Sequence, residues 1–313
     1  IKPRIKINAG NISVSNRGVF FKGMQGESGG ELFSMEGDVK NGSDVNLIIR
    51  NEQLNARHIP AFLPVLQGWN LDGVAAFEMS IKSTVAGNVA MMGRLGGYAG
   101  HVLQYQVKNV NLDFVREADV VSLNISSVDA YGGKGSGSAY LHLVPKGSET
   151  IRLDLDLRQV DLQNYFGSHH FQGNGDVSIH LQDNPLAWNG VVNFTGKTAT
   201  VFGQPLHQAT LLLHKTPTQL QFKDGSMLMV GLTPAPLWFT GQLLADSHFD
   251  VAVKAKNIES DNLYFLQTKV GNYHLEYGLV GEFTGEFNDA FKLDPIAHIR
   301  GKGDLTVAKA SVQ

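Results

Sequence analysis

The sequence contains no cysteine, so it offers no disulfide, no thiolate metal ligand and no cysteine nucleophile. It also lacks any run of about 18 apolar residues, the length that a membrane-spanning helix needs. No excess of charge of one sign is present, because 26 basic residues stand against 29 acidic ones. This balance gives no electrostatic footprint for nucleic acid, and we expect no nucleic-acid partner.

The sequence is instead rich in apolar residues and glycine. Hydrophobic residues make up 42% of the chain and charged residues 18%, which allows a sizeable core. The 35 glycines suggest many tight turns or close backbone approaches. The chain begins at Ile1 without a methionine or a visible signal peptide. We therefore expect a segment of a longer protein, with any membrane anchor in segments outside this chain.

Apolar and polar residues alternate with period two in many segments. In "IRLDLDLR" (151–158), the apolar residues fall on one face and the charged residues on the other. The segments "AAFEMSIK", "DVSIHLQ" and "HFDVAVKAK" follow the same rule, which predicts half-buried strands. Polar joints such as "KDGS" (223–226) are typical of hairpin turns. The best helix candidate, 55–67, contains Pro60 and Pro64 and is limited to a turn or two.

These segments recur along the chain. Three stretches share one order: a glycine-punctuated strand, an apolar strand, a polar hairpin, an alternating strand, and then Gln or Asn followed by an aliphatic residue. The aliphatic landmarks Leu54, Val160 and Ile258 lie roughly 100 residues apart. No shift in composition marks a domain boundary. We therefore predict one continuous repeat array over residues 1–313, built as an all-β fold of elongated, twisted and curled antiparallel sheet with very little helix.

The glycine run in "AYGGKGSGSAYLHLV" (130–144) resembles a phosphate-binding loop only superficially. Such a loop needs its glycines between a strand and the N-terminus of a helix. Here strand alternation follows Gly137, and no Gly-Lys-Ser/Thr is present. The glycines are better explained by strong twist, bulges or close backbone contact.

No group of residues predicts catalysis or metal binding. Asp154 and Asp156 alternate with Arg152 and Arg158, as expected of a solvated, charge-compensated face. His169 and His170 are adjacent and would point to opposite faces of a strand. We therefore expect no enzyme activity, no catalytic residue, no metal and no cofactor.

A sheet with one apolar face must cover that face. Because few helices are available, a curled sheet would use the apolar face to line an elongated groove. The residues expected to line this lipid-binding groove are Val45, Leu47, Phe77, Met79, Ile81, Leu153, Leu155, Leu157, Val177, Ile179, Leu220, Phe222, Phe249, Val251 and Val253. For each of them, packing in an ordinary protein core remains the alternative.

The glycine-spaced strands of 171–214 and the phrase "LQFKDGSMLMVGL…FTGQL" resemble the AsmA-like superfamily, and most closely its TamB (translocation and assembly module B) family of diderm bacteria. The resemblance implies a β-taco fold and a periplasmic bridge between the inner and outer membranes, anchored in the inner membrane. It also implies a hydrophobic groove that conducts phospholipid acyl chains and supports outer-membrane biogenesis, with an outer-membrane barrel protein as a possible partner. The alternative is a structural or adaptor β-repeat module that aids outer-membrane protein assembly or cell-surface adhesion.

Overall fold

A computed structural model of the chain is all-β, as the sequence predicts. Its strands pair in antiparallel order in an open, curled sheet. The two short helices of the described part are the 3₁₀ helix η1 (Ala56–Ala61) and α1 (Leu162–Phe166). The structure describes residues 5–28, 30–41, 44–61, 66, 69–83, 89–102, 105–142, 150–166, 169, 171–182, 188–194, 199–201, 203–216, 218–230, 234–244, 248–259, 273–289 and 292–312.

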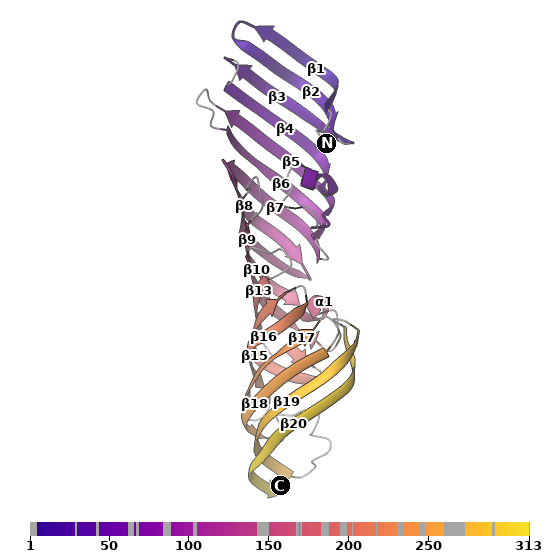
Figure 1. Ribbon diagram of the computed structural model, residues 1–313, viewed down its shortest axis with the longest axis vertical. Helices are drawn as coiled ribbons and strands as arrows, with labels where there is room; N and C mark the ends of the chain where they lie inside the picture. The colour runs from indigo at the N-terminus through magenta and orange to yellow at the C-terminus, as the bar shows by residue number, and fades with distance from the viewer. Residues whose placement is uncertain are drawn as a thin grey trace. The chain divides into compact units, whose positions relative to one another are not determined.

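The chain divides into two compact units. The first comprises Ile1–Ala130 and Lys134–Leu155, and the second comprises Tyr131–Gly133 and Asp156–Gln313. In the first unit, consecutive strands from β1 to β8 pair along the chain (Figure 1). Its strands are β1 (Ile5–Ser15), β2 (Gly18–Ser28), β3 (Glu31–Lys40), β4 (Asp44–Asn55), β5 (Asp72–Ser83), β6 (Val89–Val102), β7 (Tyr105–Glu117), β8 (Val120–Ala130), β9 (Gly133–His142) and the start of β10 (Thr150–Asp161).

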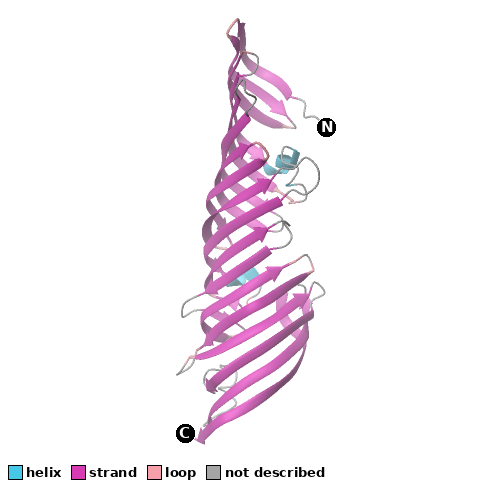
Figure 2. Ribbon diagram, turned by 60° about the vertical axis from the view of Figure 1, so that its left-hand side comes forward, coloured by secondary structure: helices cyan, strands magenta, loops and turns pink. Residues whose placement is uncertain are grey.

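The second unit continues the same plan. The short ladder of β11 with β14 lies beside the main order, in which β12, β13 and β15 to β20 pair in sequence. Figure 2 shows how strands dominate over helix in the chain. Its strands after β10 are β11 (Phe171–Gln172), β12 (Asn174–Gln182), β13 (Trp188–Phe194), β14 (Ala199–Val201), β15 (Gln204–Lys215), β16 (Gln219–Met229), β17 (Ala235–Leu244), β18 (His248–Glu259), β19 (Tyr273–Asp289) and β20 (Lys292–Val312).

Period-two alternation located the strands well, with one correction. The segment "KDGS" (223–226), predicted as a hairpin turn, lies inside β16. The β16–β17 register instead shifts between Phe222 and Gly225, which marks a β-bulge. A bulge and a turn draw on the same residue types, because both need backbone conformations outside the regular strand.

The landmark residues of the repeat lie at β-bulges. Gln159 and Asn257 have positive φ angles of 57° and 53°, and the residues that follow them, Val160 and Ile258, are fully buried. The break in register between Asn51 and Leu54 places a bulge at the first landmark too. A left-handed residue followed by a buried one bends the strand and increases its twist. The landmark pattern therefore encodes the curl of the sheet.

Two further bulges have the same form and were not predicted. Asn109 (φ 51°) precedes buried Val110, and Gln208 (φ 45°) precedes buried Ala209. Both positions coincide with breaks in register. The four left-handed residues lie 50, 49 and 49 residues apart, at half the predicted spacing of the landmarks.

Polar side chains satisfy backbone groups that bulges release from the ladder. The Gln159 N–H donates to the Asp176 carboxylate at 3.0 Å, and the Gly97 N–H donates to the side-chain oxygen of Asn111 at 3.0 Å. Without such acceptors, these N–H groups would have to find water. The bends are thus fixed by side chains on neighbouring strands.

Both short helices follow landmark strands. The predicted helix at 55–67 appears as the single 3₁₀ segment η1, in which Pro60 lies. Helix α1 begins after Asp161, whose carboxylate accepts hydrogen bonds from the Gln163 and Asn164 N–H groups at 2.9 and 3.2 Å. This is N-terminal capping. Within the described residues, neither helix has the length and apolarity required to cross a membrane.

Candidate functional site

The strands of the first unit share one apolar face. Residues directly opposite each other in an antiparallel ladder point to the same side of the sheet. The registers therefore define rows of side chains that run from strand to strand. One row contains Ile12, Phe21, Gly37, Leu47, Ile81 and Met91, and a second contains Met24, Met35, Ile49, Met79, Gly93, Phe114 and Leu123.

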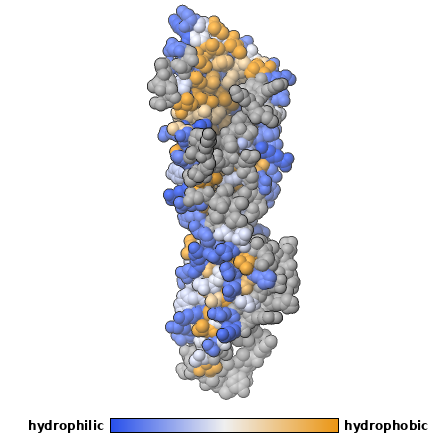
Figure 3. Space-filling view, in the orientation of Figure 1, coloured by the Kyte–Doolittle hydropathy of each residue, from blue (hydrophilic) through white to orange (hydrophobic). Residues whose placement is uncertain are grey.

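This apolar face is only partly covered. Most side chains of its rows are of intermediate exposure, and on β1 Ile12 and Val14 are 56% and 77% exposed. Hydrophobic side chains gather over the strands nearest the N-terminus in Figure 3. An apolar surface that extends over several strands marks a binding site more often than scattered single residues do.

The fifteen residues predicted to line a groove fall into two groups. Leu157 and Val177 are buried, at 2% and 0% exposure, and pack as core residues. The others are half-buried: Val45, Leu47, Phe77, Met79, Ile81, Leu153, Leu155, Ile179, Leu220, Phe222, Phe249, Val251 and Val253. Five of these, Val45, Leu47, Phe77, Met79 and Ile81, lie together on β4 and β5 of the first unit.

Glycines and aromatic rings meet across the ladders. Among the pairs in which a glycine lies directly opposite a phenylalanine are Gly26 with Phe33, Gly93 with Phe114 and Gly225 with Phe239. A Cβ atom built on any of these glycines would approach the opposing ring within 2.5–2.6 Å. The ring therefore occupies the space above the glycine and covers its backbone. These pairs give the apolar face a surface of flat rings.

The apolar face of the second unit is more completely filled. One row joins Val177, Val192 and Leu211, with exposures of 0%, 0% and 9%. In the next row, Leu213 is 1% exposed and lies between Gly190 and Phe222. These side chains pack against protein and leave less surface for a ligand.

The opposite face of the first unit is polar. Arg50 bridges two strands, with 2.6 Å to the Glu36 carboxylate and 2.7 Å to the Glu78 carboxylate. The hydrogen bonds that Arg50 donates, first the one to Glu36 and then the one to Glu78, raise the pKa of Arg50. The hydrogen bond from Arg50 lowers the pKa of Glu78. The polar face is thus a charge-compensated surface exposed to solvent, where such pairs contribute little.

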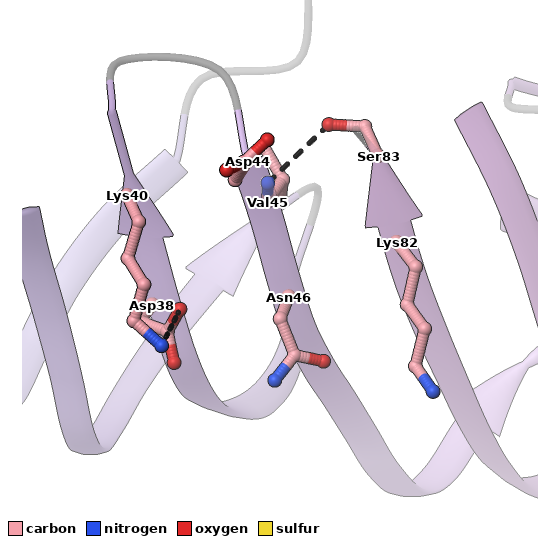
Figure 4. A pocket seen from close by; sticks show the side chains of 7 residues that line it. All are labelled: Asp38, Lys40, Asp44, Val45, Asn46, Lys82 and Ser83. Atoms are coloured by element: carbon pink, nitrogen blue, oxygen red, sulfur yellow. Dashed lines mark hydrogen bonds and ion pairs between the residues drawn. The ribbon is translucent and has the colours of Figure 1, made fainter. Parts of the chain in front are cut away.

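A shallow hollow of about 370 Å³ lies at the ends of β3, β4 and β5 (Figure 4). Most of its lining belongs to the polar face. The Lys40 ammonium pairs with Asp38 at 3.3 Å, and the Val45 N–H donates to the Ser83 hydroxyl at 3.3 Å. The hollow is lined by Asp38, Lys40, Asp44, Val45, Asn46, Lys82 and Ser83. Of the predicted lipid-binding residues, only Val45 reaches it.

A polar cluster joins the start of β5 to the end of β6. The Asp72 carboxylate accepts hydrogen bonds from the His101 N–H at 2.9 Å and from its ring Nδ1 at 3.0 Å. These bonds, chiefly the one from the His101 side chain, lower the pKa of Asp72. The buried Tyr98 hydroxyl lies 2.6 Å from the Asp72 carbonyl oxygen and 2.7 Å from that of His101. Burial raises the pKa of Tyr98 to about 12.

A second charged group of the structure lies on the face of β10 that was predicted to be solvated. Arg152 pairs with Asp154 at 2.9 Å, as predicted for a charge-compensated face. Across the part of the chain that the structure describes, no three histidine or acidic side chains come together as metal ligands. His170 lies outside the described residues.

Comparison with known proteins gives no relative. No family model, no curated protein and no solved structure matches the chain. The function must therefore be inferred from the two faces of the sheet and from the sequence itself.

Proposed function

We propose that this chain is a lipid-transfer module of the cell envelope, which conducts phospholipid acyl chains along the apolar face of its curled sheet. In this proposal the module lies in the periplasm, bridges the inner and outer membranes and supports outer-membrane biogenesis. This role requires no catalytic residue and no cofactor. The observation that carries the proposal is the set of half-buried apolar rows in the first unit, supported by the sequence resemblance to AsmA-like proteins.

The energetics suit this role. Each methylene moved from water onto an apolar surface contributes about 0.8 kcal/mol, so a 16-carbon chain gains on the order of 10 kcal/mol when fully covered. The rows present similar side chains on successive strands, with Leu47, Ile81 and Met91 at equivalent positions. Because Leu47, Ile81 and Met91 are all uncharged and of similar size, an acyl chain can move along this part of the row without a large barrier.

The test compares two neighbours on β4 that point to opposite faces. Leu47→Glu places a charge on the apolar face, whereas Ile48→Glu places the same charge on the polar face. We expect delipidated wild-type protein and Ile48→Glu to take up fluorescent phospholipid from vesicles. Leu47→Glu should take up about tenfold less, since an acyl chain cannot cover a charge without cost. Mass spectrometry of purified wild-type protein should also find bound phospholipid.

Absence of lipid from the purified protein, together with no uptake by the delipidated wild type, would exclude the proposal. Equal uptake by Leu47→Glu and Ile48→Glu would exclude the apolar face as the binding surface.

A second function, a structural or adaptor module, is favoured by the filled rows of the second unit. There Val177, Val192 and Leu213 are at most 1% exposed. If this unit only supports the array, a charge at Val251 should reduce stability without a selective loss of lipid uptake.

A further inference from the structure

Arg116 is a charged residue on the apolar face of the first unit. On β7, Leu112, Phe114 and Arg116 share one side of the strand, and the alternating exposure of β7 follows the same pattern. In the ladders, Arg116 lies opposite Met91 on β6 and Val121 on β8. It thus extends the row that contains Leu47, Ile81 and Met91.

The guanidinium of Arg116 lies at the hairpin between β7 and β8, at the rim of the sheet. Its Nε donates to the Ala118 carbonyl oxygen at 3.2 Å. Nowhere in the described part of the chain does a carboxylate pair with it. The neighbouring Glu117 belongs to the opposite face, where it pairs in register with Ala90 and Val120. The remaining guanidinium donors are therefore available to a ligand.

Glu31 shows the contrasting case of a charged residue on the same face. Its carboxylate accepts hydrogen bonds from Asn51 Nδ2 at 3.3 Å and from the Asn55 N–H at 3.2 Å, and it lies 2.8 Å from His58 Nδ1. Glu31 therefore holds η1 against the strands and is satisfied by the protein. Arg116 has no equivalent set of partners.

We propose that Arg116 binds the headgroup phosphate of a glycerophospholipid whose acyl chains lie on the adjoining apolar row. This inference rests on the proposed function and adds the polar end of the ligand. The planar guanidinium matches two phosphate oxygens at once, and such charge-assisted pairs are stronger than neutral hydrogen bonds. Arg116 at the rim and Met91 next to it provide a cationic and an apolar contact side by side, as an amphiphile requires.

The test uses two soluble ligands with the same short acyl chains, dihexanoyl phosphatidylglycerol and dihexanoylglycerol, in calorimetric titrations. The first carries the phosphate and the second does not. We expect the wild type to bind the phosphate-bearing lipid about tenfold more tightly. Arg116→Ala should remove this preference and leave the affinity for dihexanoylglycerol unchanged, while Arg116→Lys should retain part of it.

Arg94→Ala is the matched control, because it removes the same charge from the polar face of β6, where Arg94 pairs with Glu78 at 3.5 Å. It should keep the full preference. Circular dichroism and thermal unfolding establish that each variant is folded. Inorganic phosphate at the same concentration should not compete, since it lacks the acyl chains that supply most of the affinity.

The outcomes separate the two proposals. If the wild type binds both lipids equally well, or if Arg116→Ala keeps the preference, the role of Arg116 is wrong and the lipid-transfer function stands. If the wild type binds neither lipid, the proposed function fails, and the role of Arg116 fails with it. If inorganic phosphate displaces the lipid, Arg116 belongs to a phosphate site without a lipid requirement.

Discussion

The rings of Phe77 and Phe114 stack across a strand that lies between them. Their centroids are 5.9 Å apart and their planes differ by 9°. Phe77 belongs to β5 and Phe114 to β7, and on the intervening strand β6 Gly93 lies directly opposite Phe114 and diagonally from Phe77. The two rings can meet because Gly93 has no side chain. One glycine thus joins three strands through a single aromatic contact.

This relationship predicts a strong effect of a side chain at Gly93. A Cβ there would lie 2.2 Å from the Glu78 carbonyl oxygen and 2.6 Å from the Phe114 ring. We expect Gly93→Ala to lower the free energy of unfolding by about 1–3 kcal/mol, as overpacked sites do. Urea denaturation measures this.

Gly96→Ala on the same strand is the control, since its Cβ would meet only Asn111 Oδ1, at 3.5 Å. It should change stability little. An equal loss at both positions would mean that the ring stacking does not depend on Gly93.

The bulge at Gln159 predicts opposite effects of two substitutions. A left-handed conformation disfavours β-branched residues, so Gln159→Val should lower the unfolding free energy by about 1–2 kcal/mol. Gln159→Gly fits the same φ of 57° without strain and should be at least as stable as the wild type. Arg158→Val, one residue earlier and outside the left-handed region, is the control for side-chain loss. If Gln159→Val were as stable as Arg158→Val, the bulge would not constrain this position.

Asp72 predicts a loss of stability in acid. Its pKa is lowered in the folded protein by the hydrogen bonds from His101, so the folded state favours the carboxylate. The contribution is fully present above the ordinary pKa of 3.8 and is lost as the pH falls through the lower folded value. Asp72→Asn should flatten the acid limb of a plot of unfolding free energy against pH. Asp119→Asn, at an exposed turn, removes the same charge and should leave the limb in place.

Tyr98 predicts a corresponding loss in alkali. Its pKa is raised to about 12 by burial, so the folded state disfavours the phenolate. Stability from this group is full below the ordinary value of 10.0 and is lost as the pH rises from there through the folded value. Tyr98→Phe should remove this alkaline dependence. At neutral pH it should cost about 1 kcal/mol for the lost hydrogen bond. An unchanged alkaline limb in Tyr98→Phe would assign the transition to another group.

The sequence predicted the strands because period-two alternation follows directly from the geometry of a sheet with one buried face. The sequence also identified Val160 and Ile258 as landmarks of a repeat. It did not indicate that the strands bend at these residues. The glycine run around Gly137 forms a strand with close backbone contact, as predicted, because a Cβ atom added at Gly137 would collide with the Asp154 carbonyl oxygen.

Other features depend on register, which alternation alone does not define. Which residue faces which across a ladder decides that Phe114 covers Gly93 and that Arg116 adjoins Met91. The two intermediate bulges were not predicted from the sequence. Their segments, Asn109–Val110 and Gln208–Ala209, share only a polar residue followed by a small or aliphatic one, and this pattern is too common to indicate a bulge. The segment "KNVN" (108–111), with its asparagine at the left-handed position, is the feature of the sequence from which the bulge at Asn109 could have been predicted.

The regular placement of the left-handed residues bears on how such a chain changes in length. Because Asn109, Gln159, Gln208 and Asn257 recur at nearly constant intervals, duplication or deletion of one whole interval would leave every remaining bend in phase with its neighbours. A single-residue insertion within a strand would instead exchange its two faces. Evolution can therefore lengthen or shorten this chain by whole intervals between left-handed residues without disturbing the remaining bends.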